Sequence, residues 1–115
     1  MATPLVTFVQ EGSAIDYTPV ADVEAGAVVL QNDLLGVTKR KIVANEQGAL
    51  HVAGVFEFPK ATGGGSAIDV GLDVYWDDAE QVAKTDDEAG ANKRIGKTIA
   101  ATVDADEFVR VRLSQ

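Results

Sequence analysis

The residues best suited to chemistry lie in one short stretch, GLDVYWDD, which begins at Gly71. It places Trp76, the single tryptophan of the chain, beside the adjacent carboxylates Asp77 and Asp78. Glycosidases use two carboxylates that face each other across a sugar ring, so the stretch is a candidate sugar-cleaving site. Adjacent residues of a strand point to opposite faces, however, so Asp77 and Asp78 make a poor catalytic pair unless another acid joins them.

We favour a structural interpretation of this stretch. Val74 and Trp76 then face a core, Asp73 and Tyr75 face solvent, and the acids at 77–78 form a solvated turn. A calcium site made by these acids with Glu80 is a weaker hypothesis, because their spacing is not that of an EF-hand loop. We therefore expect no catalytic, cofactor-binding or metal-binding residue in the chain.

Other reactive side chains are sparse. His51 is the sole histidine and no cysteine is present, which excludes zinc sites built from Cys and His ligands within one chain. No Gly-x-Ser-x-Gly elbow occurs, so we expect His51 to be a partly exposed strand or interface residue. The run Gly63–Ser66 lacks the lysine of a phosphate loop and is interpreted as a mobile tip that orders on a partner. Lys60 at its base is interpreted as a solvated end that could meet an acidic neighbouring subunit.

The charge balance excludes several classes of partner. The net charge is -8, and an acidic surface repels phosphates, so we expect no nucleic-acid partner. The one basic cluster, Lys39–Lys41, is interpreted as the solvated face of a strand. No apolar run approaches the roughly 18 residues of a membrane span, and the N-terminus lacks the pattern of a signal peptide. We therefore expect no membrane partner.

Many short strands must position these residues. Runs of β-branched and aromatic residues alternate with turns rich in glycine, asparagine and aspartate. The main runs are 5–9, 15–18, 27–30, 34–37, 50–58, 72–76, 95–103 and 108–113. This pattern predicts an all-β fold, a small single-domain β-barrel or sandwich of β-clip-like type. We expect at most one short helix, with 78–84 as its best candidate, and interpret 81–85 as a weak strand.

The chain divides into an N-terminal arm, residues 1–12, and a single β-rich domain, residues 13–115. A faint internal repeat begins at Gly26 and again at Gly71. Each copy runs through a short apolar strand, an acidic turn, a glycine beside Val or Ile, a threonine and a late apolar strand. A duplicated β-unit and the general likeness of small β proteins are both compatible with this pattern.

Several short blocks follow one another in a characteristic order. They are Gly36-Val37, GVFEFPK at 54–60, Gly71 with VYWD at 74–77, Ile95-Gly96 and VRVRL at 109–113. In this order and spacing the chain resembles the phage capsid cement, or decoration, protein family, most specifically in GVFEFPK and GLDVYWD. The long acidic loop TDDEAGANK and the glycine run at 63–65 depart from the family pattern.

The resemblance implies a non-enzymatic protein of the virion, made in the bacterial cytoplasm and placed on the outer surface of the phage head. Such proteins associate as homotrimers and hold neighbouring subunits of the major capsid protein together. The residues expected to contact the capsid or another copy are Leu5, Val6, Phe8, Val9, Lys60 and Gly64. The apolar arm would add a strand to a neighbour's sheet edge. Two alternatives remain: a carbohydrate-binding β domain that stacks sugars on Tyr75 and Trp76, and another virion accessory protein of the head-tail junction or tail.

Overall fold

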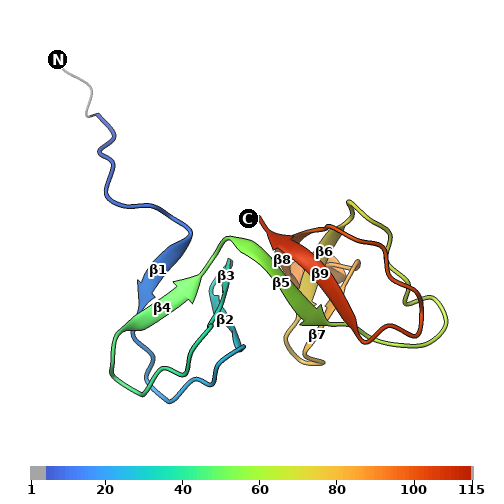
Figure 1. Cartoon of the computed structure of the whole chain (residues 1–115), viewed down its shortest axis with the longest axis horizontal. Coiled ribbons are helices and arrows are strands. Elements are labelled where there is room, and N and C mark those ends of the chain that lie inside the picture. The colour runs from blue at the N-terminus through green and yellow to red at the C-terminus, as the bar shows by residue number, and fades with distance from the viewer. Residues whose placement is uncertain (1–4, 115) are drawn as a thin grey trace.

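Short antiparallel strands make up the computed structural model, which describes residues 5–114 (Figure 1). The strands are β1 (Ala14–Tyr17), β2 (Val28–Gln31), β3 (Leu34–Val37), β4 (Gly48–His51), β5 (Gly54–Pro59), β6 (Asp73–Asp77), β7 (Val82–Lys84), β8 (Lys93–Thr98) and β9 (Phe108–Leu113). A single 3-10 turn, η1 (Glu88–Gly90), completes the described elements. The all-β prediction is confirmed. The best helical candidate, 78–84, forms no helix but a turn followed by β7, which confirms the weak strand predicted at 81–85.

The strands form two sheets that lie side by side in Figure 1. The N-terminal sheet has the order β1-β4-β3-β2, and the C-terminal sheet has the order β5-β9-β8-β6-β7. Only Val52 and Ala53 separate β4 from β5, so one sheet passes directly into the other. A parallel bridge from Lys60 to Ala83 brings the end of β5 to β7, which curls the C-terminal sheet towards a closed barrel.

One apolar core holds the two sheets together. Strand β9 supplies Val109, Val111 and Leu113 to it, while the two arginines between them point outward, as strand alternation predicts. Leu35 and Val37 of β3 belong to the same core cluster, although they come from the N-terminal sheet. Burying apolar surface from both sheets in one place ties their positions to each other.

The two copies of the sequence repeat pair their strands in the same way. Strands β2, β3 and β4 of the first copy are neighbours in the order β4-β3-β2, and β6, β8 and β9 of the second copy are neighbours in the order β9-β8-β6. In the first copy the N–H of Gly26 donates to the carbonyl oxygen of Thr38 at 2.7 Å, and in the second the N–H of Gly71 donates to that of Thr98 at 2.9 Å. The strand order and these hydrogen bonds support a duplicated β-unit.

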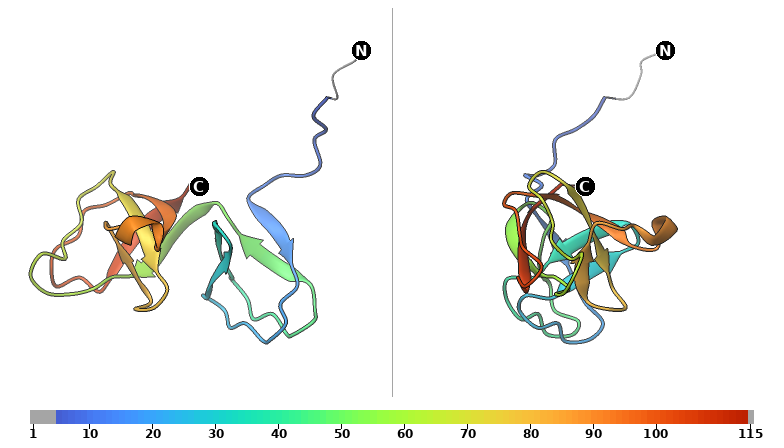
Figure 2. Two further views of the ribbon diagram at one scale, coloured as in Figure 1. Left: turned by 180° about the vertical axis from the view of Figure 1, so that it is seen from behind. Right: turned by 90° about the vertical axis from the view of Figure 1, so that its right-hand side faces the viewer.

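Residues 5–12 form no strand in the described chain and lead away from both sheets in the views of Figure 2. The strand expected at 5–9 is therefore not formed within a single copy. A strand needs an edge to pair with, and the arm meets none in its own chain. The first four residues of the arm lie outside the described residues.

Candidate functional site

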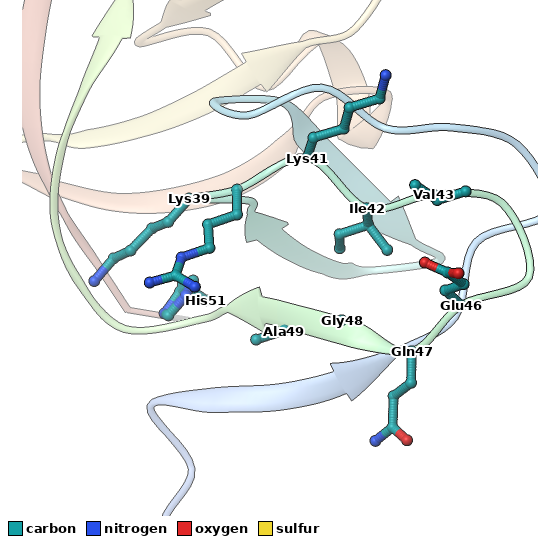
Figure 3. Close-up of a pocket in the computed structure, with 10 residues that line it drawn as sticks. Lys39, Lys41, Ile42, Val43, Glu46, Gln47, Gly48, Ala49 and His51 are labelled. Carbon is teal, nitrogen blue, oxygen red and sulfur yellow. The ribbon is translucent and has the colours of Figure 1, made fainter.

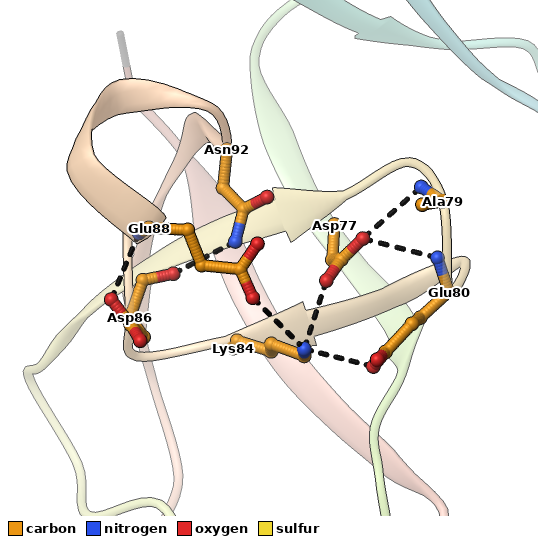
Figure 4. A network of polar contacts seen from close by, with 7 residues as sticks. All are labelled: Asp77, Ala79, Glu80, Lys84, Asp86, Glu88 and Asn92. Atoms are coloured by element: carbon orange, nitrogen blue, oxygen red, sulfur yellow. Dashed lines mark hydrogen bonds and ion pairs between the residues drawn. The ribbon is translucent and has the colours of Figure 1, made fainter.

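Asp77 closes the turn between β6 and β7 instead of facing solvent (Figure 4). It is 5% exposed. Its Oδ1 accepts hydrogen bonds from the backbone N–H groups of Ala79 at 3.1 Å and Glu80 at 3.0 Å. Its Oδ2 lies 2.8 Å from Nζ of Lys84. The solvated turn expected at this residue is wrong, because the carboxylate is buried and satisfied by groups of the same hairpin.

The electrostatics of this cluster oppose acid catalysis. The hydrogen bond from Lys84 and then the N–H of Glu80 hold the pKa of Asp77 below its ordinary value. Lys84 itself lies 2.8 Å from a carboxylate oxygen of Glu80 and 3.3 Å from one of Glu88. These acids, with Asp77 the foremost, raise the pKa of Lys84. A glycosidase acid needs a raised pKa, so the cluster has the properties of a structural brace.

Asp78 supports the neighbouring tryptophan. Its Oδ1 accepts hydrogen bonds from Nε1 of Trp76 at 3.1 Å and from Nε2 of Gln81 at 3.0 Å. The indole is 2% exposed and packs edge-on against Phe58, with ring centroids 6.0 Å apart. Stacking on a sugar needs an exposed ring face. The burial of Trp76 removes the surface on which the carbohydrate-binding alternative depends.

Metal sites and membrane-spanning helices are both absent from the described residues. Among residues 5–114, no three side chains of His, Asp or Glu gather in a way that could hold a metal ion. Within that same range, no helix has both the length and the apolar character needed to cross a membrane.

Lys60 is buried rather than solvated. Its Nζ donates hydrogen bonds to the carbonyl oxygens of Ala61 at 2.8 Å and Asp106 at 2.9 Å, and lies 3.4 Å from Oγ of Ser66. The ammonium group thereby ties the loop at 61–66 to the loop before β9. Gly64 sits at the exposed part of this glycine-rich loop. The structure thus brings Lys60 and Gly64 together, with Lys60 as a positioning residue beneath the loop.

The arm carries four strongly exposed apolar side chains within five residues. Their exposed fractions run from 76% to 100% for Leu5, Val6, Phe8 and Val9. Soluble proteins rarely leave several apolar side chains in a row open to water, and such a segment marks an interaction site. The structure places these four predicted contact residues together, far from the loop that carries Gly64.

An apolar groove runs between the two sheets. Its volume is about 450 Å³, and Val28, Val37 and Phe56 line it, with Trp76 also contributing. Nζ of Lys39 lies 5.9 Å from the ring centroid of Phe56, a cation–π distance. No pattern in the sequence predicts this groove, because its walls come from strands of different sheets.

A basic hollow of about 570 Å³ adjoins this groove (Figure 3). Lys39, Arg40 and His51 line it. Lys41 also lines the hollow, and its Nζ lies 3.9 Å from Oδ2 of Asp22. Burial and then the charge of Lys39 lower the pKa of His51. The three basic residues at 39–41 are exposed, as predicted, but they follow the end of β3 at Val37 and do not form the face of a strand.

Comparison with known proteins places the chain in a family. A sequence model described as phage cement protein matches residues 9–113. No curated protein and no solved structure matches the chain. The matched range covers both sheets and includes the GVFEFPK and GLDVYWD blocks, which form β5 and β6 with their flanking residues. The chain belongs to the phage cement protein family.

Proposed function

We propose that this chain is a non-enzymatic cement protein that binds the outer surface of a phage head as an oligomer, most simply a homotrimer. There it stabilises the contacts between neighbouring subunits of the major capsid protein. Membership of the cement family supports a role at the capsid. The observation that carries the proposal is the exposed apolar arm on a well-packed β core, because such an arm is a contact element without a partner in its own described chain.

The mechanism needs contact area and multiple attachment points rather than chemistry. DNA packed in a head pushes capsid subunits apart. A protein that grips several subunits at once raises the free energy needed to separate them, and linked contacts gain from effective concentration. An oligomer whose symmetry matches a capsid site makes all of its contacts together.

Two surfaces are proposed to contact the capsid or another copy of the chain. The first is the arm, with Leu5, Val6, Phe8 and Val9. The second is the loop that presents Gly64, which the buried ammonium of Lys60 holds in place. The net charge of -8 supports a location away from the packaged DNA, because an acidic protein repels phosphates. We propose that the chain is made in the bacterial cytoplasm and reaches the virion by assembly.

Binding to purified expanded heads tests this function. The full chain should cosediment with heads up to a fixed number of copies and should raise the temperature at which heads release DNA. Heads without the protein and heads mixed with an unrelated acidic β protein are the controls. Labelled protein should decorate the whole head surface in electron micrographs. Failure to cosediment would overturn the proposal, and label confined to the tail or one vertex would favour a head-tail or tail accessory protein.

A further inference from the structure

The groove between the sheets is bordered by outer strands on both sides. Strand β2 ends the N-terminal sheet and β5 begins the C-terminal sheet. The N–H of Lys60 donates to the carbonyl oxygen of Glu107, on the β9 side. Backbone groups alternate in direction along an antiparallel pair, so those of Val55 and Glu57 face away from β9. An edge of this kind is a template for another strand.

The arm has the composition and length of such a strand. Its sequence LVTFV consists of β-branched, aromatic and other apolar residues together with one threonine, which suits a half-buried strand. Five extended residues span roughly 17 Å, close to the length of the six-residue β5, roughly 20 Å. Its exposed apolar side chains match the apolar lining at Val28 and Phe56.

Charge complementarity also favours the arm as the occupant. Glu11 follows the apolar run by two residues and is exposed. Lys39 lines both the groove and the basic hollow, and Arg40 lines the hollow. Within residues 5–114, no ion pair engages Lys39 or Arg40, whereas the neighbouring Lys41 has carboxylate partners. An arm lying in the groove would carry its carboxylate towards these two cations.

We propose that the arm of one copy, residues 5–11, inserts into the groove of a second copy, with Glu11 beside Lys39. This deepens the proposed function, on whose oligomeric assembly it rests. The donor is a second copy because the arm of the same chain leads away from both sheets (Figures 1 and 2). Repeated around a symmetric capsid site, this head-to-tail exchange closes a ring and buries every arm.

Engineered disulfides test the insertion directly, because the natural chain has no cysteine. Phe8→Cys combined with Val28→Cys is oxidised in the full chain, both free in solution and bound to expanded heads. A second pair, Thr7→Cys with Val28→Cys, allows for a slip of one residue. One of these pairs should give covalent species of three or more copies on denaturing gels, whereas each single variant stops at dimers. The control pair, Phe8→Cys with Val103→Cys, joins the arm to an exposed valine outside the groove and should yield about ten-fold less.

The outcomes separate this inference from the cement function. If no cross-links form either in solution or on heads, the arm does not insert into the groove. If the disulfide forms within one chain, the inserted arm does not come from a second copy. If the protein forms no cross-links but still cosediments with heads, the arm exchange is refuted and the cement function is not. Cross-linked oligomers that never bind heads would support the exchange and refute the cement function.

A charge swap tests the ion pair. Glu11→Lys and Lys39→Glu should each weaken self-association by roughly two- to five-fold, the range of exposed ion pairs. The double variant should return to within about two-fold of the natural chain, because the pair is restored with its charges exchanged. Glu11→Lys with Lys41→Glu is the matched control and should not recover. Sedimentation velocity measures each constant, and failure of the first pair to recover would contradict the contact.

Discussion

Asp77 and Asp78 illustrate how environment decides the role of a side chain. The first is enclosed by two backbone N–H groups and Lys84, and the second accepts the indole N–H of Trp76. Asp77 is buried and Asp78 is exposed, so the two adjacent acids lie in different environments, although their types and adjacency suit glycoside chemistry. Buried carboxylates persist in proteins when hydrogen bonds and a cation replace their hydration. At this hairpin the replacement is local, since all the partners belong to residues 76–84.

Lowering the pH should remove the contribution that the ionised carboxylate of Asp77 makes to folding stability. Its pKa is lowered in the folded chain from an ordinary value of 3.8, so ionisation favours folding. The stabilisation is fully present above that value and is lost as the pH falls through the lower folded pKa. Urea unfolding, followed by Trp76 fluorescence between about pH 5 and pH 2, should show a steeper loss of stability in the natural chain than in Asp77→Asn. The exposed Glu46→Gln serves as control, and parallel curves for Asp77→Asn and the natural chain would contradict the brace.

His51 should affect the pH dependence of folding stability at a higher pH than Asp77 does. Burial, then the charge of Lys39, lowers its pKa below the ordinary 6.5, so the folded chain favours the neutral ring. The unfolded chain therefore takes up the proton first as the pH falls below 6.5, and stability declines until the folded pKa is reached. As His51 is the sole histidine, NMR of its ring protons gives the folded pKa directly. Lys39→Gln should raise that pKa, and an unchanged value would show that Lys39 exerts no field on the ring.

The burial of individual side chains was predictable from the sequence where it depends only on the alternation of residues along a strand. Val74 and Trp76 are buried, as predicted from the period of two along a strand. The burial of Asp77 could not be predicted, because its partner Lys84 arrives only through the register of the β6-β7 hairpin. Lys60 was misjudged for the same reason. Its hydrogen-bond acceptor at Asp106 is far away in sequence and is brought near by the pairing of β5 with β9.

At the scale of elements, most strands were predictable, including the four-residue strands β1, β2 and β3, whereas the three-residue β7 was predicted only weakly. Strand β9 has six alternating residues, and its inward and outward faces follow the prediction. Strand β7 has three residues, too few to show a period, which left 78–84 open to a helical interpretation. Gln81 adopts a positive φ of 59°, which a helix does not accommodate, and β7 starts at the next residue.

The pairing of β8 with β9 depends on a close approach at Gly96. A Cβ atom there would lie 1.9 Å from the carbonyl oxygen of Arg112, which is backbone and cannot turn aside. Gly96→Ala should therefore lower the free energy of unfolding by about 3 kcal/mol, the upper range for overpacking. Gly64→Ala is the matched control, because nothing lies within 4 Å of its Cβ position. Chemical denaturation measures both, and an equal effect of the two substitutions would show that β9 can shift to accept the methyl group.

At the scale of the whole molecule, the arm and the core have different roles. The core buries apolar side chains from both sheets and fixes the shape, whereas the exposed arm adds little to the stability of a single copy. The class of fold was therefore predictable from the sequence, whereas the groove was not. The class follows from local patterns, whereas the groove exists only after β2 and β5 have been brought together from two sheets.

Deleting residues 2–12 should separate stability from binding. No hydrogen bond or ion pair of the described chain involves residues 5–12, and the first contact of this region is the carbonyl oxygen of Ser13 with the N–H of Val52. The free energy of unfolding should thus stay within about 0.5 kcal/mol of the full chain. Affinity for expanded heads should fall by about ten-fold or more, because every copy of an oligomer loses its arm and the losses multiply. Chemical denaturation and cosedimentation measure the two effects. Unchanged head binding would show that the arm is not needed for binding to the capsid, and a marked loss of stability would show that it packs against its own chain.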